Sequence, residues 1–141
     1  MVEPIANPRL ELEGQFVKLL PVTQLERQLE SQEYKIFSKK SGLEIGVVVI
    51  KFEKETPIVM SICIEEAKRG YGNGTDALLT LLLDMAKSYK VVKAFAPSDL
   101  GLAAFFWVRM GFHPCFGKAP DGGLWFMRNL TESLTYNPLE S

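Results

Sequence analysis

A glycine-rich segment in the middle of the chain has the residue types needed to hold a phosphate group. In this segment, Arg69-Gly70-Tyr71-Gly72-Asn73-Gly74-Thr75, three alternating glycines let the main chain approach an anion closely. If a helix begins here, several backbone N–H groups lack partners and point at one place. The Thr75 hydroxyl can add a donor, and Lys68 and Arg69 add positive charge. The segment predicts an anion site, although the same glycines would also suit a tight strand-to-helix connection.

The spacing of the glycines excludes two common nucleotide motifs. The segment has the pattern Gly-x-Gly-x-Gly, whereas the dinucleotide fingerprint is Gly-x-Gly-x-x-Gly. A P-loop would continue with Gly-Lys and a serine or threonine, which this chain lacks at that place. The spacing alone therefore leaves the identity of the phosphate ligand open.

The elements around this segment are those of an α/β protein. Ile58 to Ile64 is largely apolar, as in an interior strand, and apolar residues recur on one helix face from Thr75 to about Tyr89. Val91 to Ala96 predicts a strand, and a helix from about Leu100 to Met110 follows, which Gly111 ends. The other predicted elements are a strand at Phe16–Leu20, a helix from Thr23 to about Glu30, a hairpin of Tyr34–Ser38 and Leu43–Phe52, and strands at Phe112–Phe116 and Leu124–Leu130. This order predicts a mixed α/β fold with one central sheet.

Two motifs of the chain resemble those of the GNAT (N-acetyltransferase) superfamily. Arg69, Gly72 and Gly74 stand at the defining positions of its Arg/Gln-x-x-Gly-x-Gly/Ala pyrophosphate motif. Ala103 to Phe112 is similar to its helix-then-Gly-Phe segment, and the order of elements from Phe16 to Leu130 also resembles the family's. The resemblance implies a GNAT-like acyl-CoA N-acyltransferase fold. Its central, splayed, mostly antiparallel sheet would be flanked by helices, with a shortened helical segment after the first strand.

The resemblance also implies that acetyl-CoA binds in a gap between two splayed strands, Ile58–Ile64 and Val91–Ala96. The pyrophosphate would lie on the glycine segment, while backbone groups near Ile62–Ile64 would bond the pantetheine arm and polarise the thioester carbonyl. The implied reaction is direct attack of a primary amine on the thioester. The implied coenzyme-binding residues are Ile62, Cys63, Ile64, Arg69, Gly70, Tyr71, Gly72, Asn73, Gly74, Thr75, Ser98 and Phe106. Ser98 would also suit a helix cap, and Phe106 the core.

The candidate catalytic residues depart from the family's pattern. Many members have a tyrosine four residues before the glycine of Gly-Phe; Trp107 stands there in this chain, and its indole N–H is no acid near neutral pH. The leaving thiolate could take a proton from solvent, another residue could substitute, or the domain could bind acyl-CoA without turnover. Glu65 is a candidate base and His113 a candidate proton carrier. Both residues would also suit purely structural or solvated positions.

The length, charge and cysteines of the chain limit which domains, partners and cellular setting we expect. With 141 residues and a net charge of −1, we expect one domain at 14–131 and no nucleic-acid partner. The ends, 1–13 and 132–141, are expected to be a flexible lead-in and a flexible tail. Cys63 and Cys115 lie far apart, which argues against a metal pair, and the predicted strand position of Cys63 suits a buried thiol; no metal site and a reducing, cytoplasmic setting are expected. The longest apolar stretch is too short to span a membrane, so no membrane segment is expected.

The segment that would bind the acceptor amine is short. The resemblance places acceptor specificity after the first strand, where only about Pro21 to Glu33 is available, enough for one short helix. An open cleft results, which suits a small amine or the amine of a peptide or protein, and a homodimer partner could close it. The alternative function is a non-catalytic acyl-CoA-binding or protein-interaction module with a degenerate active site.

Overall fold

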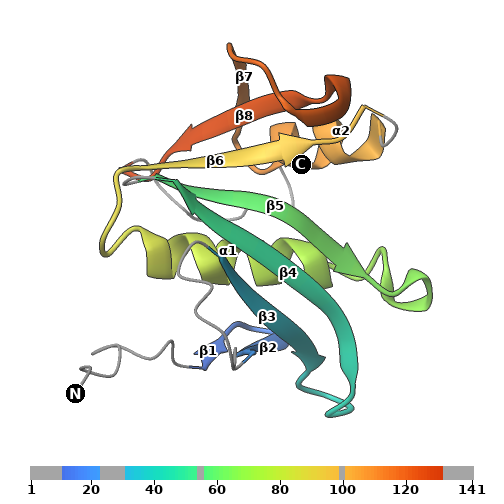
Figure 1. The fold of residues 1–141 in the computed structure, drawn as a ribbon. Coiled ribbons are helices and arrows are strands. Elements are labelled where there is room, and N and C mark those ends of the chain that lie inside the picture. Colours follow the sequence, from blue (N-terminus) through green and yellow to red (C-terminus); the bar gives the residue numbers. More distant parts are fainter. Residues whose placement is uncertain (1–10, 23–30, 54–55, 99–100, 132–141) are drawn as a thin grey trace.

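The central feature of the fold is one mixed sheet of eight strands (Figure 1). The computed structural model describes residues 11–22, 31–53, 56–98 and 101–131. The strand order is β1-β2-β3-β4-β5-β6-β8-β7, and all neighbours are antiparallel except β5 and β6, which are parallel. The strands are β1 (Leu12–Glu13), β2 (Val17–Pro21), β3 (Ser31–Ser38), β4 (Glu44–Glu53), β5 (Thr56–Ile64), β6 (Val91–Ala96), β7 (His113–Cys115) and β8 (Leu124–Asn129). The predicted α/β class with a mostly antiparallel sheet is confirmed.

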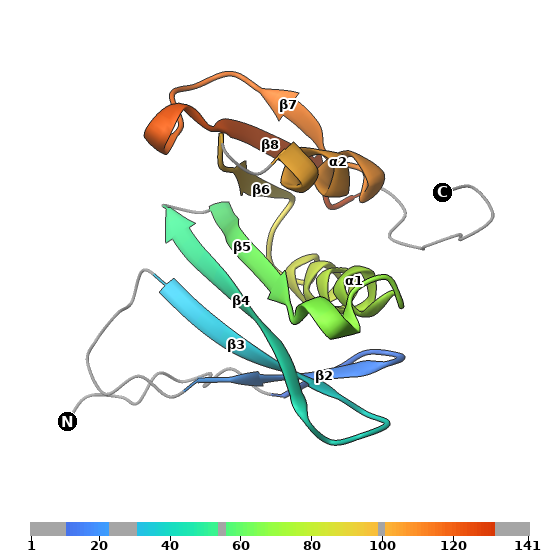
Figure 2. The same ribbon diagram turned by 90° about the vertical axis from the view of Figure 1, so that its right-hand side faces the viewer.

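Two α-helices, α1 (Asn73–Met85) and α2 (Gly101–Arg109), lie on the same side of this sheet (Figures 1 and 2). A short 3-10 turn, η1 (Glu66–Lys68), precedes α1, and a second, η2 (Pro120–Gly122), lies between β7 and β8. Helix α1 connects β5 to β6, as expected for a crossover between parallel strands. Both helices therefore face the same sheet surface that carries the apolar core.

The core follows from the periodicities of these elements. In β4, Val48 and Ile50 are fully buried while Val49 between them is only half-buried, which is the alternation of a strand with one covered face. In α1, Leu78 and Leu82 are buried one turn apart. Each such side chain contributes about 1.5–3 kcal/mol when it leaves water. These residues belong to one continuous core that joins the sheet to both helices.

The N-terminal part of the chain differs from the sequence prediction at one point. Leu12 and Glu13 were expected in the flexible lead-in, but they pair with β2 as the short strand β1. Leu12 packs against the core, which explains why this segment is ordered with the sheet. The helix predicted from Thr23 to about Glu30, most of the lead-in and the predicted tail lie outside the described residues.

Helix α1 is shorter at its end than the apolar pattern predicted. Its last residue is Met85, whereas the prediction extended to about Tyr89. Beyond Met85 the chain tightens into turns, with N–H groups of Lys87 and Ser88 bonded to carbonyl groups three residues earlier (3.2 and 3.0 Å). Tyr89 still packs against the core, so the apolar pattern correctly indicated its partial burial although the helix ends before it.

Candidate functional site

The gap between β5 and β6 is the first component of the candidate site. The two strands are paired over only a short stretch and then diverge (Figure 1). The residue pairs are Ile58 with Lys93 and Val59 with Ala94. On its other edge β5 stays paired with β4 as far as Ile64, and the register shifts at Met60, a β-bulge where the strands part. The implied splay is confirmed, and beyond Met60 one edge of β5 faces the gap instead of a strand.

Cys63 occupies a different environment from the predicted one. Ile62 and Ile64, on either side of it, are half-buried and pack against the core. Because side chains alternate along a strand, Cys63 points to the opposite face, where it is exposed. The expectation of a buried Cys63 thiol is therefore wrong. An apolar strand covered on both faces would bury every side chain, whereas the helices cover only one face of β5 here.

The glycine loop has the backbone conformation that favours anion binding. Gly70 and Gly72 both have a positive φ, 85° and 84°, and an added Cβ at either position would meet no atom within 4 Å. Arg69 donates its Nε hydrogen to the Ile64 carbonyl (2.8 Å), and Asn73 donates from Nδ2 to the Lys68 carbonyl (3.2 Å). These bonds close the loop on the end of β5. The side of the two glycines toward which a Cβ would project is open.

The first turn of α1 has backbone amides that precede the hydrogen bonds of the helix. The first intrahelical bond runs from the Asp76 N–H to the Gly72 carbonyl (2.9 Å), so the amides of Asn73, Gly74 and Thr75 precede the helical ladder. A helix N-terminus carries about half a positive charge, which attracts phosphate. The Thr75 side chain is only 9% exposed, so the backbone amide is the group that this residue can offer.

Gly74 lies where three elements come close together beside the gap. An added Cβ at this position would lie 3.6 Å from Ile64 and 4.0 Å from the Phe106 ring, both ordinary contact distances. The structure thus brings together the end of β5, the start of α1 and one ring of α2, all of which were predicted to line the coenzyme site. Tyr71 lies in the same loop, and its side chain is largely exposed.

Trp107 belongs to the core of the molecule. It is 2% exposed, and its Nε1 hydrogen is donated to the Phe95 carbonyl (3.1 Å). Its ring packs against Phe106 and Phe112 with centroid distances of 5.3 and 5.2 Å. The indole N–H is already used to connect α2 to β6. The geometry therefore supports a packing role for Trp107.

The end of α2 depends on a residue that the sequence analysis missed. Gly111 has a φ of 87°, and an added Cβ would lie 3.0 Å from the Arg128 guanidinium. Arg128 donates from Nη1 to the Met110 carbonyl (2.6 Å), so a cation stabilises the C-terminus of the helix. This arrangement explains why glycine stands in the Gly-Phe pair. No local sequence signal connects Arg128 to α2, since the two come together only through the sheet.

The remaining candidate residues lie in different places. Glu65 is exposed directly after β5, and its backbone N–H extends the pairing with β4 by bonding the Ile45 carbonyl (2.8 Å). His113 is exposed on the edge strand β7, with β8 and β6 between it and the gap. Ser98 donates its hydroxyl hydrogen to the Asp121 carbonyl (3.0 Å), which ties the end of β6 to η2. Only Glu65 of these three adjoins the loop at the end of β5.

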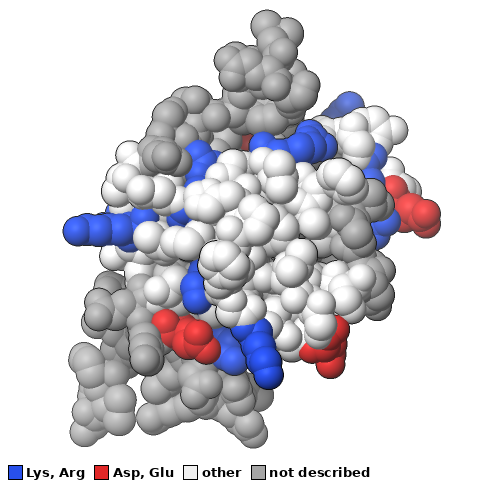
Figure 3. Space-filling view, turned by 90° about the horizontal axis from the view of Figure 1, so that it is seen from above, with Lys and Arg blue, Asp and Glu red and all other residues white. Residues whose placement is uncertain are grey.

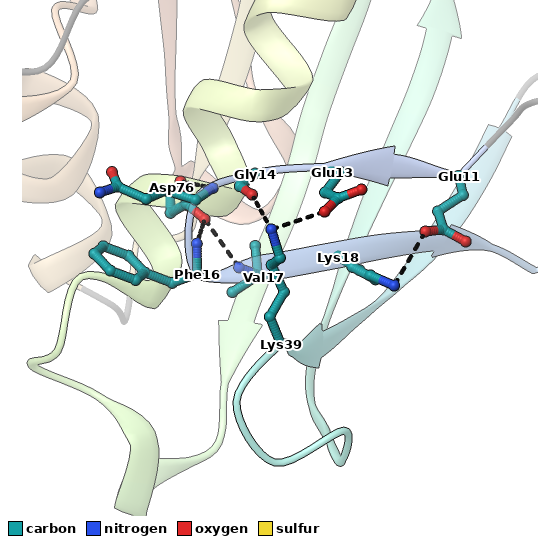
Figure 4. A network of polar contacts seen from close by, with 9 residues as sticks. Glu11, Glu13, Gly14, Phe16, Val17, Lys18, Lys39 and Asp76 are labelled. Atoms are coloured by element: carbon teal, nitrogen blue, oxygen red, sulfur yellow. Dashed lines mark hydrogen bonds and ion pairs between the residues drawn. The ribbon is translucent and has the colours of Figure 1, made fainter.

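A groove of about 510 Å³ lies away from the gap, between the β1–β2 turn and the outer face of α1. It is lined by Glu11, Leu12, Glu13, Gly14, Gln15, Asp76, Leu79, Thr80, Leu83, Asp84 and Lys87. Gly74 faces β5 and α2, whereas this groove faces the hairpin, so it does not belong to the candidate site. Asp76, one of its lining residues, lies in a network of polar contacts (Figure 4).

The described part of the chain has neither a metal-binding cluster nor a membrane-spanning helix. Among its residues, no group of three or more His, Cys, Asp or Glu side chains could hold a metal ion. None of the helices described there has the length and apolar character to cross a membrane. The face seen from above is largely uncharged, with Lys and Arg side chains and a few acidic ones scattered around it (Figure 3).

Comparison with known proteins finds matches for the structure but none for the sequence. No protein-family model and no curated protein sequence matches the chain. Solved structures do match it. One is a probable GNAT-family acetyltransferase from Chromobacterium violaceum, with a TM-score of 0.74 and 14% sequence identity over 88% of each chain.

Two further structures have the same architecture. A GNAT family acetyltransferase from Elizabethkingia anophelis, with acetyl-CoA bound, has a TM-score of 0.64 and 13% identity; the match covers 80% of this chain and 97% of that one. An acetyltransferase from Thermus thermophilus has a TM-score of 0.65 and 19% identity, covering 74% of this chain and 68% of that one. The splayed sheet, the glycine loop and these similarities agree: the chain has the fold of the GNAT-family acyl-CoA N-acyltransferases.

Proposed function

We propose that this chain is an acetyl-CoA-dependent N-acetyltransferase that acetylates a primary amine. The observation that carries the proposal is the position of the α1 N-terminus at the gap where β5 and β6 part. Amide donors for a pyrophosphate and a free strand edge for an extended arm meet there. A structure of the same fold, from Elizabethkingia anophelis, has acetyl-CoA bound.

The chain's own groups suit the pyrophosphate and the pantetheine arm of the proposed ligand. The amides of Asn73, Gly74 and Thr75, with the open side of Gly70 and Gly72, would bind the pyrophosphate. Beyond Met60 the free edge of β5 would bond the pantetheine arm as a neighbouring strand does, with Ile62, Cys63 and Ile64 as the residues in reach. The Phe106 ring, which contacts the position of Gly74, would cover the arm from α2.

The proposed reaction requires little general acid–base catalysis by side chains. A neutral acceptor amine attacks the thioester carbonyl, whose developing negative charge would be stabilised by N–H groups on the β5 edge. The CoA thiolate then leaves; a thiol's pKa of about 8.5 lets it leave and take its proton from solvent. Trp107 would therefore not be needed as an acid. We keep Glu65 as the candidate base because it is exposed at the end of β5, and His113 as a more distant one.

The acceptor and the cellular setting extend the same proposal. We propose a small amine, or an amine of a peptide or protein, as the acceptor, with a second copy of the chain closing the cleft. We propose a cytoplasmic protein. Neither a nucleic acid nor a membrane forms part of the proposal.

A thermal-shift experiment tests the coenzyme site. Acetyl-CoA at about a hundred times its dissociation constant is expected to stabilise the protein by about 2.7 kcal/mol and to raise its melting temperature. S-acetylpantetheine, which lacks the pyrophosphate, serves as the matched control and is expected to stabilise far less at the same concentration. Equal stabilisation by both compounds would remove the glycine loop from the site, and no shift with acetyl-CoA would reject the proposed function.

A turnover assay separates the enzyme from the alternative function. Release of free CoA is expected when purified protein is mixed with acetyl-CoA and a panel of amines, amino acids and peptides. The rate without acceptor is the control. Protein that is stabilised by acetyl-CoA but releases no CoA with any acceptor would instead be the non-catalytic acyl-CoA-binding module, which the buried Trp107 at the usual tyrosine position favours.

A further inference from the structure

One carboxylate connects the start of α1 to the turn between β1 and β2 (Figure 4). Asp76 accepts hydrogen bonds from three successive backbone N–H groups. The donors are Gln15 (3.0 Å), Phe16 (2.7 Å) and Val17 (3.0 Å). Bonds of backbone N–H to an ionised carboxylate are stronger than neutral ones. The three donors also offset the negative charge of Asp76, which lies in the first turn of the helix.

The turn is shaped to admit this contact. An added Cβ on Gly14 would lie 2.4 Å from Thr80 Oγ1 and 2.5 Å from Asp76 Oδ2, so only glycine allows the hairpin to approach α1 this closely. Thr80 in turn donates its hydroxyl hydrogen to the Asp76 carbonyl (2.6 Å). The hairpin and the helix therefore form a close-packed joint with Asp76 at its centre.

Asp76 belongs to the same turn as the proposed phosphate donors. Its own N–H makes the first bond of α1, to Gly72, directly after the free amides of Asn73, Gly74 and Thr75. At about 100° per residue, positions 74 and 76 lie on nearly opposite sides of the helix. Gly74 is held against β5 and α2, and Asp76 is held against the hairpin. The first turn is thus fixed from both sides.

We propose that Asp76 is a positioning residue for the coenzyme site. It holds the first turn of α1 so that the free amides point at the pyrophosphate, without touching the ligand itself. This inference rests on the proposed function, and it adds a part of the molecule, the β1–β2 hairpin, that lies on the other side of the helix from the gap.

Lys39 provides a matched control because it holds the same hairpin without touching α1. Its Nζ donates to the Gly14 carbonyl (3.1 Å) and pairs with Glu13 (2.8 Å), which lowers the pKa of that carboxyl. A Lys39→Met variant is expected to loosen the hairpin and to leave the Asp76 bonds in place, because Lys39 bonds Gly14 and Glu13 and not Asp76. Asp76→Asn keeps the size of the side chain but loses the charge and places an NH₂ group against N–H donors.

The test compares Asp76→Asn, Asp76→Ala and Lys39→Met, using acetyl-CoA titration and amide hydrogen exchange of the ligand-free protein at a temperature where all are folded. Both Asp76 variants are expected to exchange faster in residues 73–78 and to bind acetyl-CoA at least about tenfold more weakly. Lys39→Met is expected to exchange faster only in the hairpin and to bind normally. If Asp76→Ala does not fold, Asp76→Asn decides the question alone.

The outcomes that overturn the inference are distinct from failure of the proposed function. Asp76→Asn binding acetyl-CoA as tightly as the unchanged protein would reject the positioning role alone. Equal weakening by Lys39→Met would also reject it, because general hairpin integrity would then be the cause. An unchanged protein that has no affinity for acetyl-CoA would reject the proposed function, and the role of Asp76 with it.

Discussion

Replacement of Gly72 by alanine is expected to weaken acetyl-CoA binding by at least about tenfold. With a φ of 84° and no atom within 4 Å of an added Cβ, the new methyl group would project into the open space beside the loop. That space is where we propose the pyrophosphate binds. Loss of one hydrogen bond to a charged group costs about 1.5–3 kcal/mol, which corresponds to about tenfold to hundredfold in affinity. Isothermal titration calorimetry measures the change directly.

Gly42 offers a control with the same backbone geometry. It lies in the β3–β4 turn with a φ of 76°, and an added Cβ would also meet no atom within 4 Å. Alanine in this left-handed region costs about 1–2 kcal/mol, so both variants should lose similar stability. Gly42→Ala is expected to bind acetyl-CoA normally. If the two variants bind equally well, or equally poorly, the glycine loop is not the phosphate site.

Trp107→Ala is expected to lower the free energy of unfolding by about 3–5 kcal/mol. The ring is 2% exposed and packs between Phe106 and Phe112, so its removal leaves a large cavity. It also leaves the Phe95 carbonyl without its indole donor. Denaturant unfolding monitored by circular dichroism gives the midpoint and the slope needed for this value.

Phe105 is the matched control for this substitution. It is an aromatic residue of the same helix, but 70% of its side-chain surface is exposed. Phe105→Ala is therefore expected to change the free energy of unfolding by no more than about 0.5 kcal/mol. Similar losses for both variants would contradict the burial of Trp107. A small loss for Trp107→Ala would leave its ring available as a ligand contact.

The strands and helices near the site could be predicted because their signals are local. The apolar alternation of β4, the helical spacing of α1 and the glycine after α2 each lie within one element or its boundary. The glycine loop also carries its own signal, since Gly70 and Gly72 adopt the left-handed conformation that alternating glycines indicate. Local patterns thus predicted most elements around the site and the left-handed glycines of the loop, whereas anion binding by that loop stays a prediction.

Features that depend on contacts between distant segments were missed or predicted wrongly. Cys63 was expected to be buried because its strand is apolar, but burial depends on which face of the sheet the helices cover. Asp76 was not singled out, although an acidic residue in the first turn of a helix is common. Its partners lie about 60 positions earlier in the chain. No spacing rule along the sequence could have connected them.

Because β5 and β6 are paired over only a short stretch, the volume of nearby side chains determines the width of the gap between them. Beyond Val59 no ladder pair joins these strands, and the side chains of Ile64 and Phe106 both lie near Gly74 there. A larger or smaller side chain at Ile64 or Phe106 would change this aperture without breaking a backbone hydrogen bond. Single substitutions can therefore adjust the gap between these strands in small steps while the sheet pairing stays intact.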